Sequence, residues 1–164
     1  VFVQSNFGRR AWLQIAGVPV GEEMPKDVVK KDDRGSIIVI IATDAPLLPH
    51  QLRRLAKRAT LGVARTGTVG GNGSGDIFLA FSTANEQEVP QVASSHQTYQ
   101  AINDEYSDSL YEGAVWATEE AIINAMTSGE AMRAVKPEGI IPAINLEQLR
   151  EVMKKYNRLQ KEGE

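Results

Sequence analysis

Residues 35–49 read GSIIVIIATDAPLLP, an aliphatic run that leads into a turn bounded by prolines. The run from Ile37 to Ala42 does not alternate with polar residues and is rich in β-branched side chains, which indicates a strand buried on both faces. Pro49 can occupy the first turn of a helix. Helical spacing then joins the apolar residues Leu52, Leu55, Ala56 and Ala59. A buried strand followed by an amphipathic helix is typical of a layered α/β fold.

Further elements are predicted on both sides of this segment. We expect strands over residues 1–5, 11–16 and 77–81, with a turn at 6–8 and an exposed, polar loop over 17–35. A long helix is predicted over 104–128, with one apolar side made of Leu110, Ala114, Ala117, Ala121 and Ala125. A last helix follows Asn145, with Gln148 as its capping partner and an apolar stripe of Leu149, Val152, Met153 and Tyr156.

Composition narrows the possible functions. The chain has 164 residues, enough for one domain with a core, and its 42% apolar and 24% charged content is ordinary for a globular protein. Its longest apolar run, residues 37–42, is far too short to cross a membrane. There is no cysteine, which excludes disulfides and thiolate metal sites. His50 and His96 show no metal-ligand spacing, so we predict no metal site.

A basic cluster comprises Arg53, Arg54, Lys57 and Arg58. Helical spacing places these side chains along one side of the predicted helix. No aromatic residue is interleaved with them, as stacking on bases would require. We therefore interpret the cluster as a solvated helix face and predict no nucleic-acid partner.

Residues 66–76 form a glycine-rich loop with Gly67, Gly70, Gly71, Gly73 and Gly75. A dinucleotide fingerprint needs a strand before the glycines and a helix after them, but here the helix comes first. Nucleotide binding is therefore not predicted. In extended backbone, Asn72, Ser74 and Asp76 would share one face beside bare backbone, which suggests a binding site. The alternative is an ordinary turn that enters a strand.

Five segments of the chain resemble one known family. They are Val3 to Gly8, Gly35 to Pro49, Gly62 to Thr68, Gly70 to Asn85, and the segment ATEEAI from Ala117 to Ile122. In this order they are similar to the DmpA-type aminopeptidases, which include the L-aminopeptidase/D-esterases and the β-peptidyl aminopeptidases. The resemblance covers roughly residues 1–128. We cannot place the sequence after Gly129 on the family pattern.

The resemblance implies an α/β layered fold, an αββα sandwich with two β-sheets between helical layers. It also implies a precursor that cuts itself between Gly35 and Ser36. Residues 1–35 would then end the α chain and residues 36–164 would form the β chain, within one single-domain fragment that lacks most of the α chain. The sequence starts at Val1, inside a predicted strand, which fits a fragment of a longer protein. Family members assemble as homo-oligomers of αβ units.

The same resemblance assigns roles to several residues. Ser36 would be the nucleophile, with its own α-amine as the base. An ordinary α-amine has a pKa of about 7.7–8, so no histidine and no cofactor is required. Ser74 and Asp76, which is Glu in some members, would orient the nucleophile and its amine. Asn6 would stabilise the oxyanion, unless it is simply a turn residue before Gly8.

Two further expectations concern the neighbouring backbone. Gly35 has no Cβ, which would let Ser36 Oγ approach the Gly35 carbonyl for an N-to-O acyl shift. Gly71, Asn72 and Gly73 would form a loop that contacts the substrate.

The leading hypothesis is therefore a self-processing serine aminopeptidase that releases small N-terminal L-, D- or β-residues from peptides, amides or esters through an acyl-enzyme. Acetyl transfer of the ornithine acetyltransferase type is an alternative, but those enzymes use Thr as nucleophile. An unprocessed, inactive binding relative is another, although Ser36, Ser74 and Asp76 occur together here. We expect no membrane partner, and a cytoplasmic location with the periplasm as the alternative.

Overall fold

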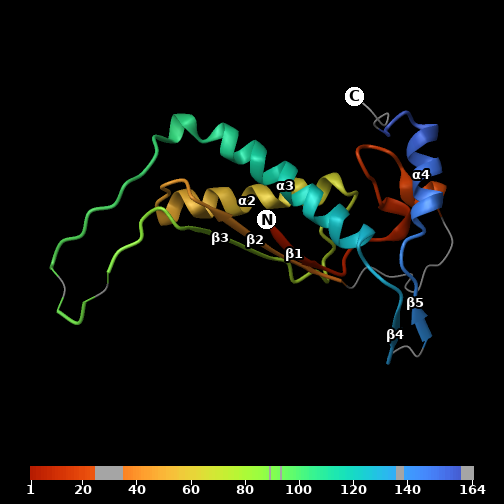
Figure 1. Cartoon of the computed structure of the whole chain (residues 1–164), viewed down its shortest axis with the longest axis horizontal. Helices are drawn as coiled ribbons and strands as arrows, with labels where there is room; N and C mark the ends of the chain where they lie inside the picture. The colour runs from red at the N-terminus through yellow and green to blue at the C-terminus, as the bar shows by residue number, and fades with distance from the viewer. Residues whose placement is uncertain (25–34, 89, 93, 136–138, 160–164) are drawn as a thin grey trace.

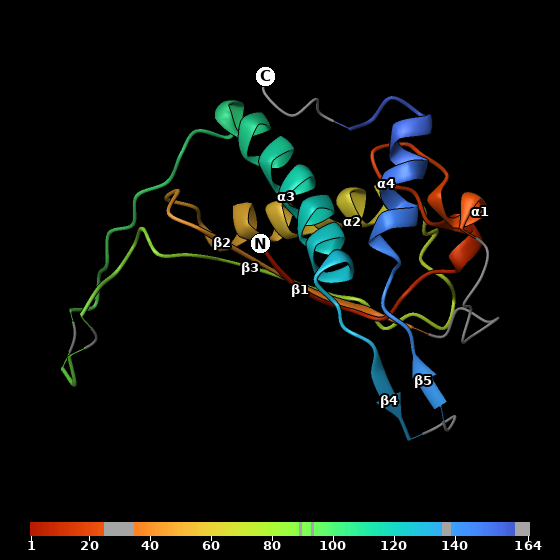
Figure 2. The same cartoon turned by 45° about the vertical axis from the view of Figure 1, so that its right-hand side comes forward.

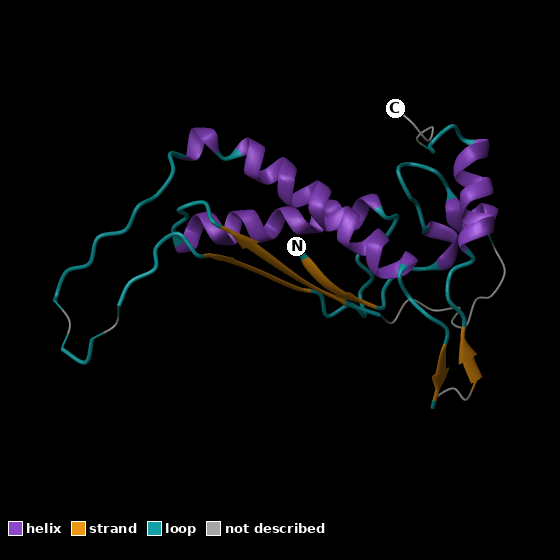
Figure 3. Cartoon of the chain, in the orientation of Figure 1, coloured by secondary structure: helices purple, strands orange, loops and turns teal. Residues whose placement is uncertain are grey.

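The computed structural model describes residues 1–24, 35–88, 90–92, 94–135 and 139–159. Strands and helices are mixed along the chain, and three strands and two long helices form the main body (Figures 1 and 3). The strands are β1 (Phe2–Ser5), β2 (Ile37–Thr43), β3 (Ile77–Ser82), β4 (Met132–Ala134) and β5 (Gly139–Ile141). The helices are α1 (Val20–Glu23), α2 (Pro49–Arg65), α3 (Asp108–Thr127) and α4 (Leu146–Lys155), with short 3-10 turns at Arg10–Trp12 and Asp104–Tyr106.

Strand β2 is the centre of a three-stranded sheet in the order β1-β2-β3. It runs antiparallel to β1, where Ser5 pairs with Ile37, and parallel to β3, where Ile38 pairs with Ile77. The end of β1 and the beginnings of β2 and β3 therefore meet at one edge of the sheet. The glycine-rich loop enters β3 at this edge.

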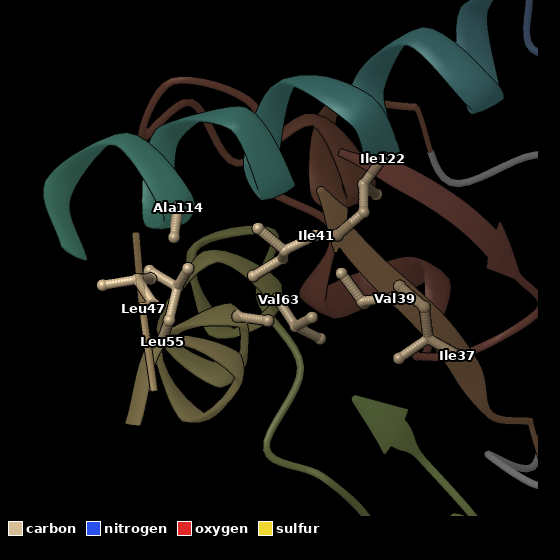
Figure 4. Packing of buried hydrophobic residues seen from close by; sticks show 9 residues of the cluster. Ile37, Val39, Ile41, Leu47, Leu55, Val63, Ala114 and Ile122 are labelled. Atoms are coloured by element: carbon tan, nitrogen blue, oxygen red, sulfur yellow. The ribbon is translucent and has the colours of Figure 1, made fainter. Parts of the chain in front are cut away.

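Helices α2 and α3 cover one face of this sheet and form the main core with it (Figure 4). Ile37, Val39 and Ile41 are buried because every second residue of β2 points toward the helices. The two helices approach closely at Gly62, where an added Cβ would lie 2.5 Å from the Val115 carbonyl oxygen. Glycine at this position therefore sets how deeply α3 packs on α2.

The opposite face of the sheet is open in the described structure. Ile38, Ile77, Leu79 and Phe81 are between 37% and 57% exposed, so the expectation that β2 is buried on both faces is wrong for this chain. The second sheet is a separate hairpin of β4 and β5, and it does not cover this face (Figure 1). The mixed α/β architecture with two sheets is confirmed. The sandwich of two packed sheets is not formed within the described residues, because their second sheet is only a two-stranded hairpin.

Two other predictions of local structure are corrected. Residues 11–16 form no regular strand, since a 3-10 turn covers Arg10–Trp12 and Ile15 pairs only with Val18 in an isolated bridge. The predicted loop 17–35 contains α1, and residues 25–34 lie outside the described residues.

The long helix begins four residues later than predicted, at Asp108, after the 3-10 turn. Its buried face includes Ala114, Thr118 and Ile122, whereas Ala125 is exposed. The prediction assigned only apolar residues to the buried face and therefore missed Thr118. The hydroxyl of Thr118 can be fully buried because its Oγ1 donates a hydrogen bond to the Ala114 carbonyl.

Helix α4 packs against α1 and the residues just before it, and together they form a second, smaller hydrophobic core (Figure 2). The side chain of Asn145 accepts a hydrogen bond from Gln148 N at 2.9 Å, which confirms the predicted cap of α4. Leu149, Val152 and Met153 are buried as predicted. No helix in the described part of the chain is both long and apolar enough to span a membrane.

A long loop between β3 and α3 extends away from the sheet and helices (Figure 1). We call its described residues, 83–88, 90–92 and 94–103, the arm. Its two limbs are joined by polar contacts, in which Asn85 Nδ2 donates to the Gln100 carbonyl and Gln100 N donates to Asn85 Oδ1. Gln87 Nε2 donates to the Thr98 carbonyl further out.

Candidate active site

Three segments that are far apart in the sequence meet at the edge of the sheet where β2 begins. Ser36 directly precedes β2, Asn6 directly follows β1, and Asp76 directly precedes β3. Because β1 is antiparallel and β3 parallel to β2, both neighbours bring these residues to the same edge. The sheet topology thus assembles the candidate site that the sequence motifs predict.

Ser36 is held by contacts to both neighbouring segments. Its backbone N–H donates to Asn6 Oδ1 at 2.9 Å, and Asn6 N donates to the Ser36 carbonyl at 3.0 Å. On the other side, Gly75 N donates to Ser36 Oγ at 2.9 Å. The hydroxyl and the nitrogen of Ser36 therefore each have a defined position. Since Asn6 Oδ1 is occupied by the Ser36 nitrogen, Asn6 Nδ2 is the atom of this amide suited to donate to an oxyanion.

Asp76 binds the residue that follows Ser36. Its Oδ1 accepts a hydrogen bond from Ile37 N at 3.0 Å and a second, short one from the hydroxyl of Ser74. Within the described residues, the side chains of Ser74 and Asp76 are hydrogen-bonded to each other and to β2, not to the Ser36 hydroxyl. This pair fixes the start of β2 relative to the loop that carries Gly75.

The backbone at Gly35 passes extremely close to Asn6. An added Cβ at Gly35 would lie 1.5 Å from the Asn6 carbonyl oxygen and 2.8 Å from Asn6 Oδ1. A side chain here would therefore displace the end of β1 and the amide that binds Ser36. Gly35 thus has a steric role toward Asn6 that adds to the one predicted from sequence.

The glycine-rich loop differs in detail from the prediction. Ser74 N donates to the Gly71 carbonyl at 2.9 Å, so Asn72 and Gly73 form a turn and do not continue an extended strand. Asn72 and Gly73 are exposed, whereas Ser74 and Asp76 are half-buried at the site. The turn separates Asn72 from Ser74 and Asp76, because every second side chain shares a face only in extended backbone. A substrate contact of Gly71, Asn72 and Gly73 stays a prediction.

The basic cluster on α2 lies outside this site. Arg54 forms an ion pair with Asp104 at 2.7 Å, and the Arg54 and Arg58 guanidinium groups lie over the Tyr111 ring. Hydrogen bonding by Gln51 lowers the pKa of Asp104, and the positive charge of Arg54 lowers it further. Arg53, Arg54 and Lys57 are exposed, as expected of a solvated helix face, whereas Arg58 is half-buried against Tyr111. His50 and His96 are exposed and are not part of the candidate site.

Two features of the site were not predicted from sequence. Gly75 contributes a backbone N–H, which no side-chain pattern reveals, although its position between Ser74 and Asp76 was a signal. A cavity of about 490 Å³ adjoins Asn6, and Arg9 and Arg10 are among its lining residues. Within the described residues, no three His, Asp or Glu side chains gather in a way that could hold a metal ion.

Solved structures show which fold this arrangement belongs to. The chain matches L-aminopeptidase D-Ala-esterase/amidase of Ochrobactrum anthropi with a TM-score of 0.88 and 47% identity, over 96% of this chain and 43% of that one. That protein is described as a prototype for the serine aminopeptidases and a new variant of the Ntn hydrolase fold. A β-aminopeptidase of Burkholderia sp. matches with a TM-score of 0.80 and 37% identity, over 93% of this chain and 43% of that one. The fold is therefore this variant of the Ntn (N-terminal nucleophile) hydrolase fold.

Sequence comparison identifies the family. The model of peptidase family S58 matches residues 1–139, and this chain belongs to that family. β-Peptidyl aminopeptidase BapA of Sphingosinicella microcystinivorans is 43% identical over 97% of this chain. The chain spans 43% of the length of that relative. The resemblance to DmpA-type aminopeptidases is thereby confirmed. It extends further than predicted, since the family model reaches residue 139 and the BapA relative aligns with nearly the whole chain.

Proposed function

We propose that this chain carries the cleavage site and the nucleophile of a self-processing serine aminopeptidase. The observation that carries this proposal is the pair of contacts around Ser36, with Asn6 Oδ1 at its nitrogen and Gly75 N at its hydroxyl oxygen. An N-terminal nucleophile needs both its amine and its hydroxyl oriented. Membership in a peptidase family whose relatives are named as aminopeptidases supports the same conclusion.

Self-cleavage would divide the chain at Gly35-Ser36. Ser36 Oγ attacks the Gly35 carbonyl carbon, the bond from that carbon to Ser36 N breaks, and the nitrogen leaves with the hydroxyl proton. Water then hydrolyses the resulting ester, which leaves a carboxylate on Gly35 and a free α-amine on Ser36. Residues 1–35 become the end of the α chain, and residues 36–164 become the β chain.

The new amine would be the base for turnover. It accepts the proton of Ser36 Oγ as this oxygen attacks the substrate carbonyl, and Asn6 Nδ2 donates to the developing oxyanion. The ammonium returns the proton to the departing amine, and water then hydrolyses the acyl-enzyme. An ordinary α-amine has a pKa of about 7.7–8, so a useful fraction is already neutral near pH 7. A preorganised amide donor of this kind contributes about 3–4 kcal/mol.

Ser74 and Asp76 would act as positioning residues in this scheme. Their hydrogen bonds tie the loop with Gly75 to Ile37, directly after the nucleophile. A carboxylate near an ammonium raises the pKa of the amine, which would oppose its role as base. The structure supports positioning because Asp76 bonds to backbone and to Ser74.

The remainder of the longer protein would complete the fold and the site. The open face of β1, β2 and β3 carries Ile38, Ile77, Leu79 and Phe81, an apolar surface that a second sheet of an αββα sandwich would bury. We propose that the α-chain segment outside this sequence supplies that sheet, and that αβ units assemble as homo-oligomers. Substrates would be peptides, amides or esters with a small N-terminal L-, D- or β-residue, consistent with the names of the relatives.

The test is the intact mass of the full-length protein after purification, beside Ser36→Ala. Two fragments with Ser36 at a new N-terminus, and an uncut variant, are expected. Ser95→Ala, on the exposed arm, is the matched control and is expected to be cut like the wild type. Hydrolysis of the p-nitroanilides of L-Ala, D-Ala and β-Ala by the cut protein then measures the activity. An uncut wild type would leave Ser36 without a free amine and would refute the proposal in favour of an inactive binding relative.

A further inference from the structure

A cavity beside Asn6 adjoins the candidate site, and the proposed mechanism does not use it. It is lined by residues from the segment after β1, the segment after α2, the C-terminal end of α3 and the segment that joins β5 to α4. Its volume of about 490 Å³ falls within the range of about 300–1,000 Å³ that is typical of small-molecule sites. Asn6 is one of its lining residues, and Asn6 Oδ1 accepts the hydrogen bond from the Ser36 nitrogen.

The charges around the cavity are unequal. Among the described residues that line it, Arg9, Arg10 and Glu130 are charged, so positive charge predominates. The Arg9 guanidinium lies 4.6 Å from the centre of the Trp12 ring, a stacking contact that restricts where this charge can lie. Arg10 is half-buried in the 3-10 turn that follows. Guanidinium groups remain charged at all physiological pH values, and their planar donors match a carboxylate.

The rest of the lining combines apolar side chains, such as Trp12, Met126 and Ile144, with uncharged polar ones. A cavity with apolar walls on one part and cationic groups on another suits a ligand that has an apolar body and one negative end. The two ends of an aminopeptidase substrate differ in this respect. Its acyl side carries an ammonium group, which two guanidinium groups repel, and its leaving side ends in a carboxylate, which they attract.

We propose that this cavity binds the leaving-group half of the substrate and that Arg9 and Arg10 recognise its free C-terminal carboxylate. The inference rests on the proposed aminopeptidase function. The ligand is an amino acid or short peptide with an apolar side chain and a free carboxylate, so dipeptides are preferred over their amides. Glu130 opposes this preference because its charge has the same sign as the carboxylate.

Kinetics on the processed full-length protein test the inference. The probes are a dipeptide and its C-terminal amide, L-alanyl-L-leucine and L-alanyl-L-leucinamide, or the D-Ala or β-Ala equivalents if those p-nitroanilides are cleaved faster. For Arg9→Gln with Arg10→Gln, we expect the acid-to-amide ratio of kcat/KM to fall about fivefold, a size suited to partly exposed ion pairs. Glu130→Gln is expected to raise the ratio. Arg53→Gln with Lys57→Gln, which removes the same two charges at exposed positions of α2, is the control and should leave the ratio unchanged.

The outcomes separate this inference from the function on which it rests. A wild-type protein that cleaves p-nitroanilides but shows the same acid-to-amide ratio as the double variant would overturn the inference alone. A wild-type protein without p-nitroanilide activity would refute the proposed function. In that case, ligand-observed NMR of L-leucine and L-leucinamide with the purified protein still decides the inference. Binding of leucine that the double variant loses supports it, and equal binding of both compounds overturns it.

Discussion

At the level of single residues, the candidate site depends on two glycines, which contribute backbone atoms and space and not a side chain. Gly75 contributes a backbone donor to Ser36 Oγ, and Gly35 contributes the space in which Asn6 reaches the Ser36 nitrogen. Asp76, which Ser74 holds by a hydrogen bond, supports this arrangement by accepting a hydrogen bond from the backbone of Ile37, the residue after Ser36. The chemistry of Ser36 is therefore controlled by how closely three backbone segments approach each other.

Gly35→Ala is expected to slow self-cleavage by roughly 10- to 100-fold, the size of effect expected when reacting atoms move by about 1 Å. The added Cβ would lie 1.5 Å from the Asn6 carbonyl oxygen, so β1 has to move away from Ser36. A time course of intact mass after expression measures the rate. Gly73→Ala is the matched control, because a Cβ there meets nothing within 4 Å. Equal cleavage of both variants would show that the close approach is not required.

Asn6→Asp is expected to lower kcat of the processed protein by about 10²- to 10³-fold. The aspartate keeps an oxygen for the Ser36 nitrogen but loses the Nδ2 donor and places a negative charge beside the oxyanion. Hydrolysis of the preferred p-nitroanilide gives kcat, with the processed fraction counted by mass. Asn124→Asp, which adds the same charge at an exposed position on α3, should retain wild-type activity. Activity of Asn6→Asp within twofold of wild type would exclude Asn6 as the oxyanion donor.

At the element scale, α4 is attached to α1 by an apolar core and by one polar cluster. Lys155 Nζ donates to both carboxylate oxygens of Glu23 at 2.9 Å, and the Tyr156 hydroxyl donates to Glu23 Oε1 at 2.7 Å. The hydrogen bond from Lys155, followed by the one from Tyr156, lowers the pKa of Glu23. The hydrogen bond to Glu23 in turn raises the pKa of Lys155.

These shifts predict how the docking of α4 depends on pH. Because the folded pKa of Glu23 is lowered, its contribution is present above the unfolded value of about 4.5 and is lost as the pH falls through the folded pKa. The raised pKa of Lys155 means that its contribution is lost as the pH rises through that value, above about 10.5. Between these limits, docking of α4 should be independent of pH.

Glu23→Gln is expected to speed amide hydrogen exchange in α4 at neutral pH, by a small factor because the cluster is partly exposed. The variant should also lack the acid-dependent loosening of α4 that we predict for the wild type. Hydrogen exchange read by mass spectrometry over residues 146–155 measures both effects. Glu22→Gln removes the same charge at an exposed neighbouring position and should behave like the wild type. Equal exchange in Glu23→Gln and Glu22→Gln would show that the apolar core alone holds α4.

At the scale of the whole molecule, the sheet is covered on one face and open on the other. Helices α2 and α3 bury Ile37, Val39 and Ile41, while the alternate side chains of β2 and β3 remain accessible. A contiguous exposed apolar surface of this kind marks an interaction site. In the longer protein we expect it to lie inside the sandwich.

Leu79→Ala in the full-length protein tests whether the exposed face of the sheet is covered there. A covered Leu79 predicts a loss of about 2–5 kcal/mol in the free energy of unfolding, whereas an exposed one predicts a change within about 0.5 kcal/mol. Denaturant unfolding of the Ser36→Ala background avoids heterogeneity from self-cleavage. Leu61→Ala is the matched control, since Leu61 is 52% exposed and Leu79 is 51% exposed in this chain. If both variants lose the same small amount, the face is not covered.

Local patterns were enough to predict much of the fold. The aliphatic run of β2, the spacing of α2 and the Asn145 cap are encoded by neighbouring residues, and the structure has all three. The strand predicted over 11–16 was wrong because a short apolar segment does not distinguish a strand from irregular structure packed into a core. The buried face of α3 was partly wrong because burial of Thr118 depends on a hydrogen bond that the apolar pattern does not show.

The residue types of the candidate site can be recognised in the amino-acid sequence. Gly35-Ser36 before an aliphatic strand, Ser74 and Asp76 before another, and Asn6 after a third carry the family resemblance, and these motifs are properties of short segments. The folded structure was needed to show that Asn6 and Gly75 contact Ser36, that one face of the sheet is open, and that Arg9, Arg10 and Asn6 line one cavity. The two contacts to Ser36 join residues that are 30 and 39 positions apart in the sequence. Their geometry follows from strand direction and helix packing, which no local pattern encodes.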